Sequence, residues 1–220
     1  RVYAPVFSEN GPEVDGSLSD WKNVPAMSIN KEEQIVRNVG QWTTENAAAE
    51  CYFWFTPETL YFAADVSDNA PMFNQYIPHQ MWRADSLEMY IGFRGPTRRS
   101  VIDKAFEYQL GVAPAQKGQG GPAAFWFHED VPIEDAKVVA METTDGYVIE
   151  SAIPLSAIEA AEEELAAGKV VSIDVKFNDL DPNEFAPAGN DPGRSLIWNG
   201  TSMNWIDPSN WGVGVLKREN

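Results

Sequence analysis

Two tryptophans stand in polar, turn-rich segments of the chain rather than in apolar ones. Trp82 lies between Pro-His-Gln-Met and Arg-Ala-Asp, and Trp205 lies between Ser-Met-Asn and Ile-Asp-Pro. Pyranose rings expose apolar C–H faces that stack on an indole, while their hydroxyls need hydrogen-bond partners at the ring edge. The placement of these two tryptophans therefore favours a sugar platform, in which facing indoles hold one ring between them. The alternative is that each indole is a lid over the hydrophobic core.

The segment just after Trp82 supplies a polar partner for such a platform. Ser86-Leu-Glu-Met-Tyr-Ile alternates in character, so a strand there turns its leucine, methionine and isoleucine toward the core and Glu88 away from it. The same alternation over two later segments directs further polar side chains outward, namely Glu107, Gln109, Asp174, Lys176 and Asn178. An ordinary polar sheet surface is the alternative, and alternation alone does not exclude it.

Enzyme signatures are absent from the sequence. It contains no Gly-x-Ser-x-Gly, P-loop, Rossmann glycine fingerprint or His-Glu-x-x-His motif. The two histidines, His79 and His128, are not at metal-pair spacing, which disfavours a histidine zinc site or a Ser-His-Asp triad. We interpret both as loop or surface residues. A glycosidase needs only two carboxylates, so a small glycan-processing enzyme that uses Glu88 and Glu107 stays a weaker alternative to a non-catalytic protein.

Short strands joined by turns must position these residues. Two β-rich runs, residues 51–55 and 60–66, flank Thr56-Pro-Glu-Thr and predict a hairpin. Trp54 in the first run, and Trp21 after an early turn, are predicted core residues. Further strands with a period of two are predicted over residues 86–93, 105–112, 146–153 and 170–178.

One segment reads as a helix. It runs from Ser156, which can cap its start, to Gly168, which can end it. Many strands with one short helix indicate an all-β fold, an antiparallel β-sandwich of two sheets of jelly-roll or immunoglobulin-like type. No repeat or low-complexity tract divides the chain, so we expect a single domain over residues 1–220.

The charge balance excludes several classes of partner. The chain has 220 residues with 16 Lys and Arg against 33 Asp and Glu, a formal charge of −17. Nucleic acids and anionic membranes are therefore unexpected partners, because both are recognised mainly through Lys and Arg. No apolar run approaches the ~20 residues of a membrane helix, so membrane insertion is not expected. The start lacks a signal peptide, so the protein is intracellular or has lost a leader, and the lone Cys51 does not decide between them.

Five segments, taken in order, resemble the pattern of carbohydrate-binding module family 9, and together they span nearly the whole chain. They are Val14-Asp-Gly-Ser-Leu-Ser-Asp-Trp, Leu60-Tyr-Phe-Ala-Ala-Asp-Val-Ser-Asp, Trp82-Arg-Ala-Asp-Ser-Leu-Glu-Met-Tyr-Ile, Gly146-Tyr-Val-Ile-Glu-Ser-Ala-Ile-Pro and Trp205-Ile-Asp-Pro-Ser-Asn-Trp-Gly. The resemblance implies a non-catalytic β-sandwich. Members occur on secreted xylanases and related plant-polysaccharide enzymes, and those characterised bind glycan ends, notably reducing ends of glucans and xylans, between two tryptophans.

The resemblance also implies roles for particular residues. The two sandwiching tryptophans correspond to Trp82 and Trp205, and the acid that bonds sugar hydroxyls corresponds to Glu88. The family's binding arginine falls near Gln109, so this chain departs from the pattern there. An amide still bonds hydroxyls but lacks the forked, charge-assisted contact of a guanidinium, which weakens the expectation of reducing-end preference more than that of sugar binding.

Two further features of the family have candidates in this chain. Its binding asparagine precedes the second tryptophan and corresponds to Asn204 or Asn199. Its structural calcium would find oxygen ligands in Asp65 and Asp68, beside Asn69, although a solvated acidic loop is an alternative for each of them. No organic cofactor is expected.

The leading hypothesis is therefore a non-catalytic module that binds a glycan terminus or a short plant-type saccharide. Trp82 and Trp205 stack on the ring, and Glu88, Gln109 and Asn204 bond its hydroxyls. We expect an extracellular, periplasmic or cell-envelope location and attachment to catalytic domains in a parent protein. The alternative from another class is a structural or interaction domain of a larger secreted or envelope protein that has lost sugar binding, which the substitution at Gln109 favours.

Overall fold

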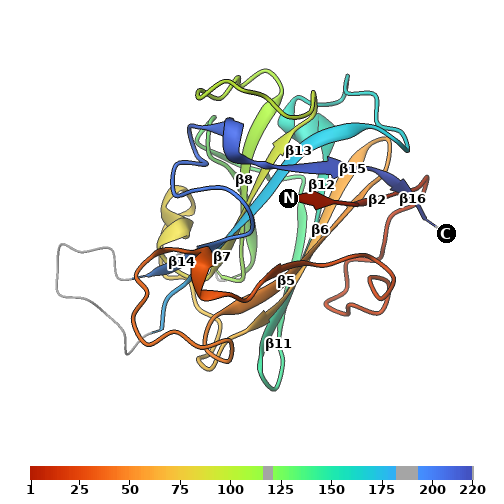
Figure 1. Cartoon of the computed structure of the whole chain (residues 1–220). Coiled ribbons are helices and arrows are strands. Elements are labelled where there is room, and N and C mark those ends of the chain that lie inside the picture. Colours follow the sequence, from red (N-terminus) through yellow and green to blue (C-terminus); the bar gives the residue numbers. More distant parts are fainter. Residues whose placement is uncertain (116–120, 182–192, 220) are drawn as a thin grey trace.

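The computed structural model describes residues 1–115, 121–181 and 193–219, which fold into two β-sheets packed face to face (Figure 1). We call the first of these the A sheet. Its strands in spatial order are β1 (Val2–Tyr3), β15 (Gly212–Val215), β13 (Val170–Asp179), β7 (Ser86–Gly92), β8 (Glu107–Ala113), β9 (Ala123–Trp126) and β10 (Val131–Pro132), with β14 (Arg194–Ile197) on β13 and β4 (Ile35–Arg37) on β14.

The second sheet, the B sheet, forms the other layer. Its order is β11 (Lys137–Glu142), β12 (Gly146–Pro154), β6 (Thr59–Ser67), β5 (Ala48–Phe55), β2 (Val6–Phe7) and β16 (Lys217–Arg218), with β3 (Met27–Ile29) paired to β5. The β5–β6 hairpin predicted around Thr56-Pro-Glu-Thr is confirmed, with Phe55 opposite Leu60. The predicted sandwich is also confirmed.

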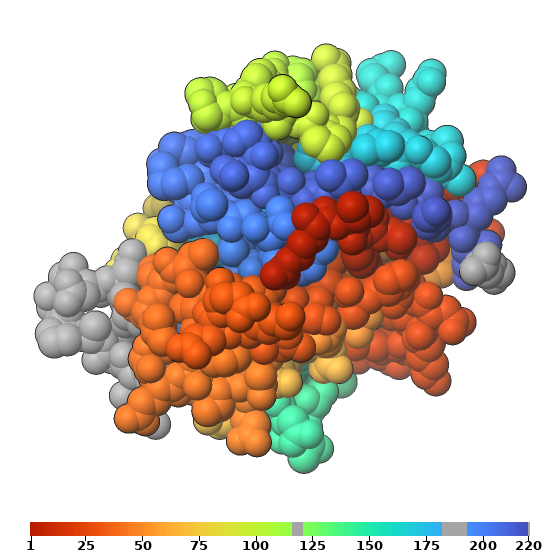
Figure 2. Space-filling model, in the orientation of Figure 1, coloured from red at the N-terminus to blue at the C-terminus, as the bar shows by residue number. Residues whose placement is uncertain are grey.

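Both sheets are mixed rather than purely antiparallel. β1 runs parallel to β15, and β2 runs parallel to both β5 and β16. All of these pairs involve strands at the chain ends, where the N-terminal residues lie along the C-terminal strands (Figure 2). Hairpin signals report only on strands that are neighbours in sequence, so the sequence contained no indication of these parallel pairs.

The core between the sheets contains the apolar half of each alternating strand. Leu87, Met89 and Ile91 are fully buried in one cluster with the matching residues of β13 and with Phe53. The predicted inward faces of β7 and β13 are therefore confirmed. Trp54 and Trp21 are also buried as expected, but in a separate cluster on the outer side of the B sheet.

The predicted helix from Ser156 to Gly168 is wrong. The chain makes only a short 3-10 turn there, η3 (Leu155–Ile158), and leaves it at Glu159, which has a left-handed φ of 57°. Ile158 and Leu165 are nevertheless buried in the main core. Burial of these side chains against the sandwich overrides the helix-start and helix-stop signals, and three consecutive glutamates in the segment weaken the helix further.

The other 3-10 turns are η1 (Glu32–Gln34), η2 (Pro78–Arg83) and η4 (Pro208–Asn210). Within the described ranges, none of the helices has the length and apolar character needed to cross a membrane.

The outward faces of the A sheet strands are not solvated, contrary to the alternation argument. Glu88 is 1% exposed and Gln109 is 7% exposed, and Asp174 is fully buried. Two segments cover this face: η2, whose Met81 packs on Phe125, and the loop that follows β14, whose Trp211 ring lies 5.5 Å from that of Tyr90. The polar residues of the A sheet therefore lie beneath a partial roof.

Candidate functional site

A cleft opens between the two roof segments on the outer face of the A sheet. Its volume is about 730 Å³, within the range of small-ligand sites. The described residues that line it include both loop tryptophans and the polar strand residues beneath them: Arg37, Trp82, Glu88, Lys104, Gln109, His128, Lys176 and Trp205. The structure therefore brings together four of the five residues predicted to bind sugar.

Trp82 reaches the cleft from η2. Pro78 begins this turn, and the Met81 carbonyl accepts hydrogen bonds from Asn74 Nδ2 at 2.8 Å and Ser86 Oγ at 2.9 Å, which fix the turn to β7. The Arg37 guanidinium carbon lies 5.2 Å from the centre of the Trp82 ring, and its Nη2 donates to the Trp82 carbonyl at 3.2 Å. A stacked cation and a backbone bond hold this half-buried indole in place.

Trp205 reaches the cleft from the loop after β14 and is 50% exposed. Beneath the loop, Asp174 accepts hydrogen bonds from the backbone amides of Asn199 at 3.1 Å and Gly200 at 2.7 Å. His128 Nε2 lies 3.4 Å from the Trp205 carbonyl. The exposed indole therefore projects from a well-anchored backbone.

Asp174 anchors this loop as a buried acid. Burial raises its pKa to about 6, although hydrogen bonds from Asn204 Nδ2 and from three backbone amides partly oppose the shift. The pKa of His128 shifts in the opposite direction from that of Asp174. Burial lowers the pKa of the imidazole, which keeps the ring neutral near pH 7. The interpretation of His128 as an ordinary loop or surface residue overlooked its place in the cleft wall.

Glu88 forms the floor of the cleft and is surrounded by donors. Oε2 accepts from Tyr90 Oη at 2.9 Å and Gln109 Nε2 at 2.6 Å. Oε1 accepts from Lys176 Nζ and Asn178 Nδ2, both at 2.8 Å. Burial alone would raise the pKa of Glu88, but the Lys176 charge and these hydrogen bonds lower it below its ordinary value.

These contacts redefine what Glu88 can do. A carboxylate has about four lone-pair positions, and the four donors fill them. A sugar hydroxyl would reach Glu88 only by displacing one of those donors. The carboxylate therefore orients Gln109 and Lys176, which themselves face the cleft.

The fifth predicted residue, Asn204, occupies a different place. Among the described residues, those lining the cleft do not include it, and its side chain is 1% exposed. Its Oδ1 accepts from the Thr201 amide at 2.9 Å, and its Nδ2 donates to Asp174 at 3.0 Å. The other candidate, Asn199, donates to the Asn210 carbonyl at 2.8 Å. In this structure both asparagines tie the Trp205 loop together.

A group of buried acids lies at the C-terminal end of β13, whose last residue is Asp179. Carboxylate oxygens of Asp68, Asp179 and Asp181 lie within 4.8 Å of one another. Burial, followed by the negative charges of Asp85, Asp68 and Asp181, raises the pKa of Asp179, and Arg194 Nη1, 2.9 Å from its Oδ2, opposes this. Asp179 Oδ1 is buried and has no hydrogen-bond partner among the described residues.

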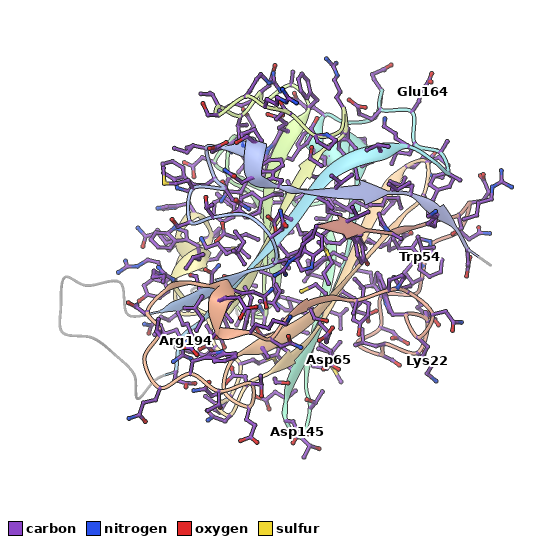
Figure 3. All side chains as sticks on the ribbon, in the orientation of Figure 1. Lys22, Trp54, Asp65, Asp145, Glu164 and Arg194 are labelled. Atoms are coloured by element: carbon purple, nitrogen blue, oxygen red, sulfur yellow. The ribbon has the colours of Figure 1, made fainter. Side chains whose placement is uncertain are left out.

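This donor set fits a calcium ion, which takes carboxylate oxygens at ~2.3–2.6 Å and therefore accommodates ligands with this mutual spacing. Of the two acids predicted as metal ligands, Asp68 belongs to the group and Asp65 does not. Figure 3 labels Asp65 on β6, where its side chain is exposed, and Arg194 on β14.

Sequence reasoning missed Arg37 and Lys104 altogether. Arg37 lies on β4, which joins the A sheet through β14. These two strands are far apart in the sequence, so a local sequence pattern does not predict their pairing. Lys104 lies in the loop before β8, where its Nζ donates to the His128 carbonyl at 2.6 Å. Lys176 was correctly placed on the same face as Glu88.

The fold and the cleft together define a class: a β-sandwich protein with a ligand-sized cleft on the outer face of one sheet. The chain belongs to the family described as Carbohydrate family 9 binding domain-like, whose model matches residues 14–219. The resemblance drawn from the sequence is confirmed. A search of curated proteins found no match.

Solved structures agree with this assignment. A carbohydrate binding module family 9 (CBM9) from Caldicellulosiruptor kristjanssonii in complex with cellotriose is similar, with a TM-score of 0.70, 16% identity, and coverage of 100% of this chain and 95% of that one. A carbohydrate binding module family 9 (CBM9) from the same organism in complex with glucose is also similar, with a TM-score of 0.69 and 17% identity. The match covers 100% of this chain and 97% of that one. At this identity the likeness establishes the fold.

Proposed function

We propose that this protein is a non-catalytic carbohydrate-binding module that holds a glycan terminus between Trp82 and Trp205. The observation that carries the proposal is that both loop tryptophans line one cleft with Gln109, Lys176 and the buried Glu88. Indole faces suit the apolar faces of a pyranose, and the amide and ammonium groups suit its hydroxyls. Glu88 contributes by fixing those groups in position.

The family supports carbohydrate as the ligand, and the related modules in complex with cellotriose and glucose support a glucan, within the glucan or xylan class that the resemblance implies. Affinity should be modest, on the order of micromolar to millimolar, because a single ring offers few atoms and polar groups on both sides must lose water. An extracellular or envelope location and attachment to catalytic domains complete the proposal.

Binding rather than hydrolysis is also favoured by the position of the candidate acid pair. Glu88 pairs with Gly111 across the β7–β8 ladder, whereas Glu107 pairs with Gly92. The two acids are therefore offset by about four residues, or ~13 Å along the strands. Glycosidase carboxylates lie roughly 5–9.5 Å apart. Glu107 is engaged elsewhere, with Arg99 Nη2 at 2.8 Å.

Calorimetric titration with glucose, xylose and their β-1,4-linked oligomers tests this function. Trp82→Ala and Trp205→Ala should each reduce affinity about fivefold or more, because stacking of a pyranose face on an indole contributes on the order of 1 kcal/mol or more per ring. Met203→Ala, in the same loop and 44% exposed, is the matched control and should bind as the wild type does. Undiminished binding by both tryptophan variants would contradict the assignment of the site.

We further propose that calcium binds Asp68, Asp179 and Asp181 as a structural ion. A divalent cation would relieve the repulsion among these buried acids and occupy the unpartnered oxygen of Asp179. Calcium should raise the melting temperature of chelator-treated protein, and Asp179→Asn should abolish that rise. Glu164→Gln changes an exposed acid at a distant place (Figure 3) and should leave it intact. A melting temperature insensitive to calcium in the wild type would rule the ion out.

A further inference from the structure

The acid group and the sugar cleft meet on two adjacent strands. Ser86 of β7 pairs directly with Asn178 of β13 in the A sheet. Asp85 immediately precedes Ser86, and Asp179 immediately follows Asn178. Asp179 belongs to the group of acids proposed to bind calcium, whereas Asn178 bonds the floor of the cleft. The two sites therefore adjoin each other along β13.

On the cleft side, Asn178 supports the floor from beneath. Its side chain is fully buried, and the described residues that line the cleft do not include it. Its Nδ2 donates to Glu88 Oε1 at 2.8 Å and to Ser86 Oγ at 3.2 Å. Ser86 Oγ in turn donates to the carbonyl of Met81, the residue before Trp82, at 2.9 Å. Asn178 is therefore connected both to Glu88 and to the turn that carries Trp82.

On the other side, negative charge is concentrated at the same point of the sheet. After burial, the charge of Asp85 is the largest cause of the raised pKa of Asp179. Burial, followed by the charge of Asp68, also raises the pKa of Asp85, although two backbone amides oppose this shift. Electrostatic repulsion among these acids therefore acts directly beside the paired Ser86 and Asn178.

Arg194 offsets part of this negative charge. Its Nη1 lies 2.9 Å from Asp179 Oδ2, whereas Oδ1 of the same carboxylate is buried and has no hydrogen-bond partner in the described part of the chain. A calcium ion on that oxygen would reduce the remaining repulsion, because calcium accepts several carboxylate ligands at once. It would thereby hold the adjoining ends of β7 and β13 together.

Resting on the proposed function and on the proposed ion, we infer that calcium and sugar bind with positive cooperativity and that Asn178 is the positioning residue that links them. Calcium fixes the end of β13 and with it the Asn178 side chain, which orients Glu88 and, through Ser86, the turn that bears Trp82. A cleft whose polar groups and indole are already fixed loses less conformational freedom when a sugar binds. Because coupling between two binding sites is reciprocal, sugar strengthens calcium binding by the same factor.

Reciprocal titrations of the wild-type protein test this coupling. Calorimetry with D-glucose and cellotriose should give an affinity about fivefold higher in calcium than in chelator-treated protein, at the lower end of typical couplings between sites. Calcium titrations with and without saturating sugar should give the same factor. Sodium chloride at matched ionic strength is the control for screening and should leave sugar affinity unchanged.

A variant separates positioning from a general loss of structure. In calcium, Asn178→Ala should bind sugar about fivefold more weakly than the wild type, with an affinity that no longer depends on calcium. Calcium should still raise its melting temperature, because Asp179 is retained. Asn10→Ala, at an exposed asparagine after β2, is the matched control and should keep the wild-type factor. If Asn178→Ala does not fold, Ser195→Ala, which removes the 2.7 Å hydrogen bond to Asn178 Oδ1, should lower the factor.

The outcomes separate the coupling from the proposals on which it rests. A sugar affinity that is unchanged by calcium, in protein whose melting temperature calcium raises, would overturn the coupling alone. A melting temperature insensitive to calcium would remove the ion and the coupling, while sugar binding would still support a carbohydrate module. Absence of binding by both sugars would contradict the proposed function and the coupling with it. A calcium factor that persists in Asn178→Ala would overturn the role of this residue, and a factor lost there but kept in Asn10→Ala would support it.

Discussion

The outer faces of the two sheets have similar residues, but the B sheet is closed by its covering segment whereas the A sheet has an open cleft. Each carries a buried glutamate, Glu88 on β7 and Glu150 on β12, and each is covered by a segment bearing tryptophan. Over the B sheet, Trp21 is 1% exposed and its ring packs edge-on against Trp54 at 6.1 Å. Over the A sheet, Trp205 stays half exposed beside an open cleft.

The difference lies in where each glutamate finds its hydrogen-bond donors. Glu150 is bonded by the covering segment itself, through Trp21 Nε1 at 2.7 Å and the backbone amides of Asp15 and Gly16. Glu88 is bonded by Tyr90 on its own strand and by side chains of β8 and β13. When the hydrogen-bond donors of a buried carboxylate come from the covering segment, moving that segment away would leave the carboxylate without partners. The free-energy cost of a buried carboxylate without hydrogen bonds therefore keeps the segment in place. A carboxylate whose donors all come from its own sheet does not need contact with the covering segment, so an open cleft can lie beside it.

The largest loss of stability should come from disrupting the segment that covers the B sheet. Trp21→Ala removes a fully packed indole and leaves Glu150 without its indole donor, so the free energy of unfolding should fall by about 3–5 kcal/mol. Urea denaturation monitored by circular dichroism measures this. Val2→Ala, at a 75% exposed side chain, is the control and should change stability little. A loss for Trp21→Ala below 1 kcal/mol would mean that this cover is not held shut as described.

A smaller effect should follow from loosening the anchor of the open side. Asp174→Asn supplies one acceptor oxygen in place of two, so donors from the Trp205 loop lose a partner and stability should fall by about 1–3 kcal/mol. The anchor should also appear in the pH dependence. The folded pKa of about 6 lies above the unfolded value, so the folded state binds the proton more tightly between pH 4 and 6.

The contribution of Asp174 to the free energy of unfolding should therefore decrease as pH rises from about 4 to 6, by at most about 3 kcal/mol. Urea titrations at successive pH values should show a flatter profile in this window for Asp174→Asn. Asp145→Asn, in the exposed turn before β12, should keep the wild-type slope. An unchanged slope in Asp174→Asn would show that this carboxyl does not titrate there.

The contrast also explains which parts of the structure the sequence could predict. Alternation correctly identified the inner faces of β7 and β13, because the main core requires one apolar side chain at every second position. It misjudged Glu88 and Asp174, because a polar residue facing away from the core looks the same whether water or a folded-back loop lies above it. Those roofs form through contacts between distant segments, such as His128 with the Trp205 backbone, and local patterns do not encode them.

Arg37 illustrates the same limit for the site. Its strand joins the A sheet only through β14, so its approach to Trp82 depends on a pairing remote in sequence. The two tryptophans, in contrast, were identifiable because an indole among turn residues departs from the usual apolar context. The unusual sequence setting of the two tryptophans was informative. The side chains that surround them in the cleft could be identified only from the folded structure.

The smallest change in stability should come from Trp205, the residue of the open side that we propose to stack on the sugar. Trp205→Ala removes an indole that is 50% exposed and that no described aromatic contact or side-chain hydrogen bond holds, so the free energy of unfolding should change by less than about 1 kcal/mol. Trp21→Ala should do the reverse, with a large loss of stability and sugar affinity preserved in the fraction that stays folded. Urea denaturation and calorimetric titration on both variants place them in one comparison. If Trp205→Ala destabilised the protein as much as Trp21→Ala, then Trp205 would be a lid over the core rather than part of a binding surface, because only a lid contributes its burial to folding.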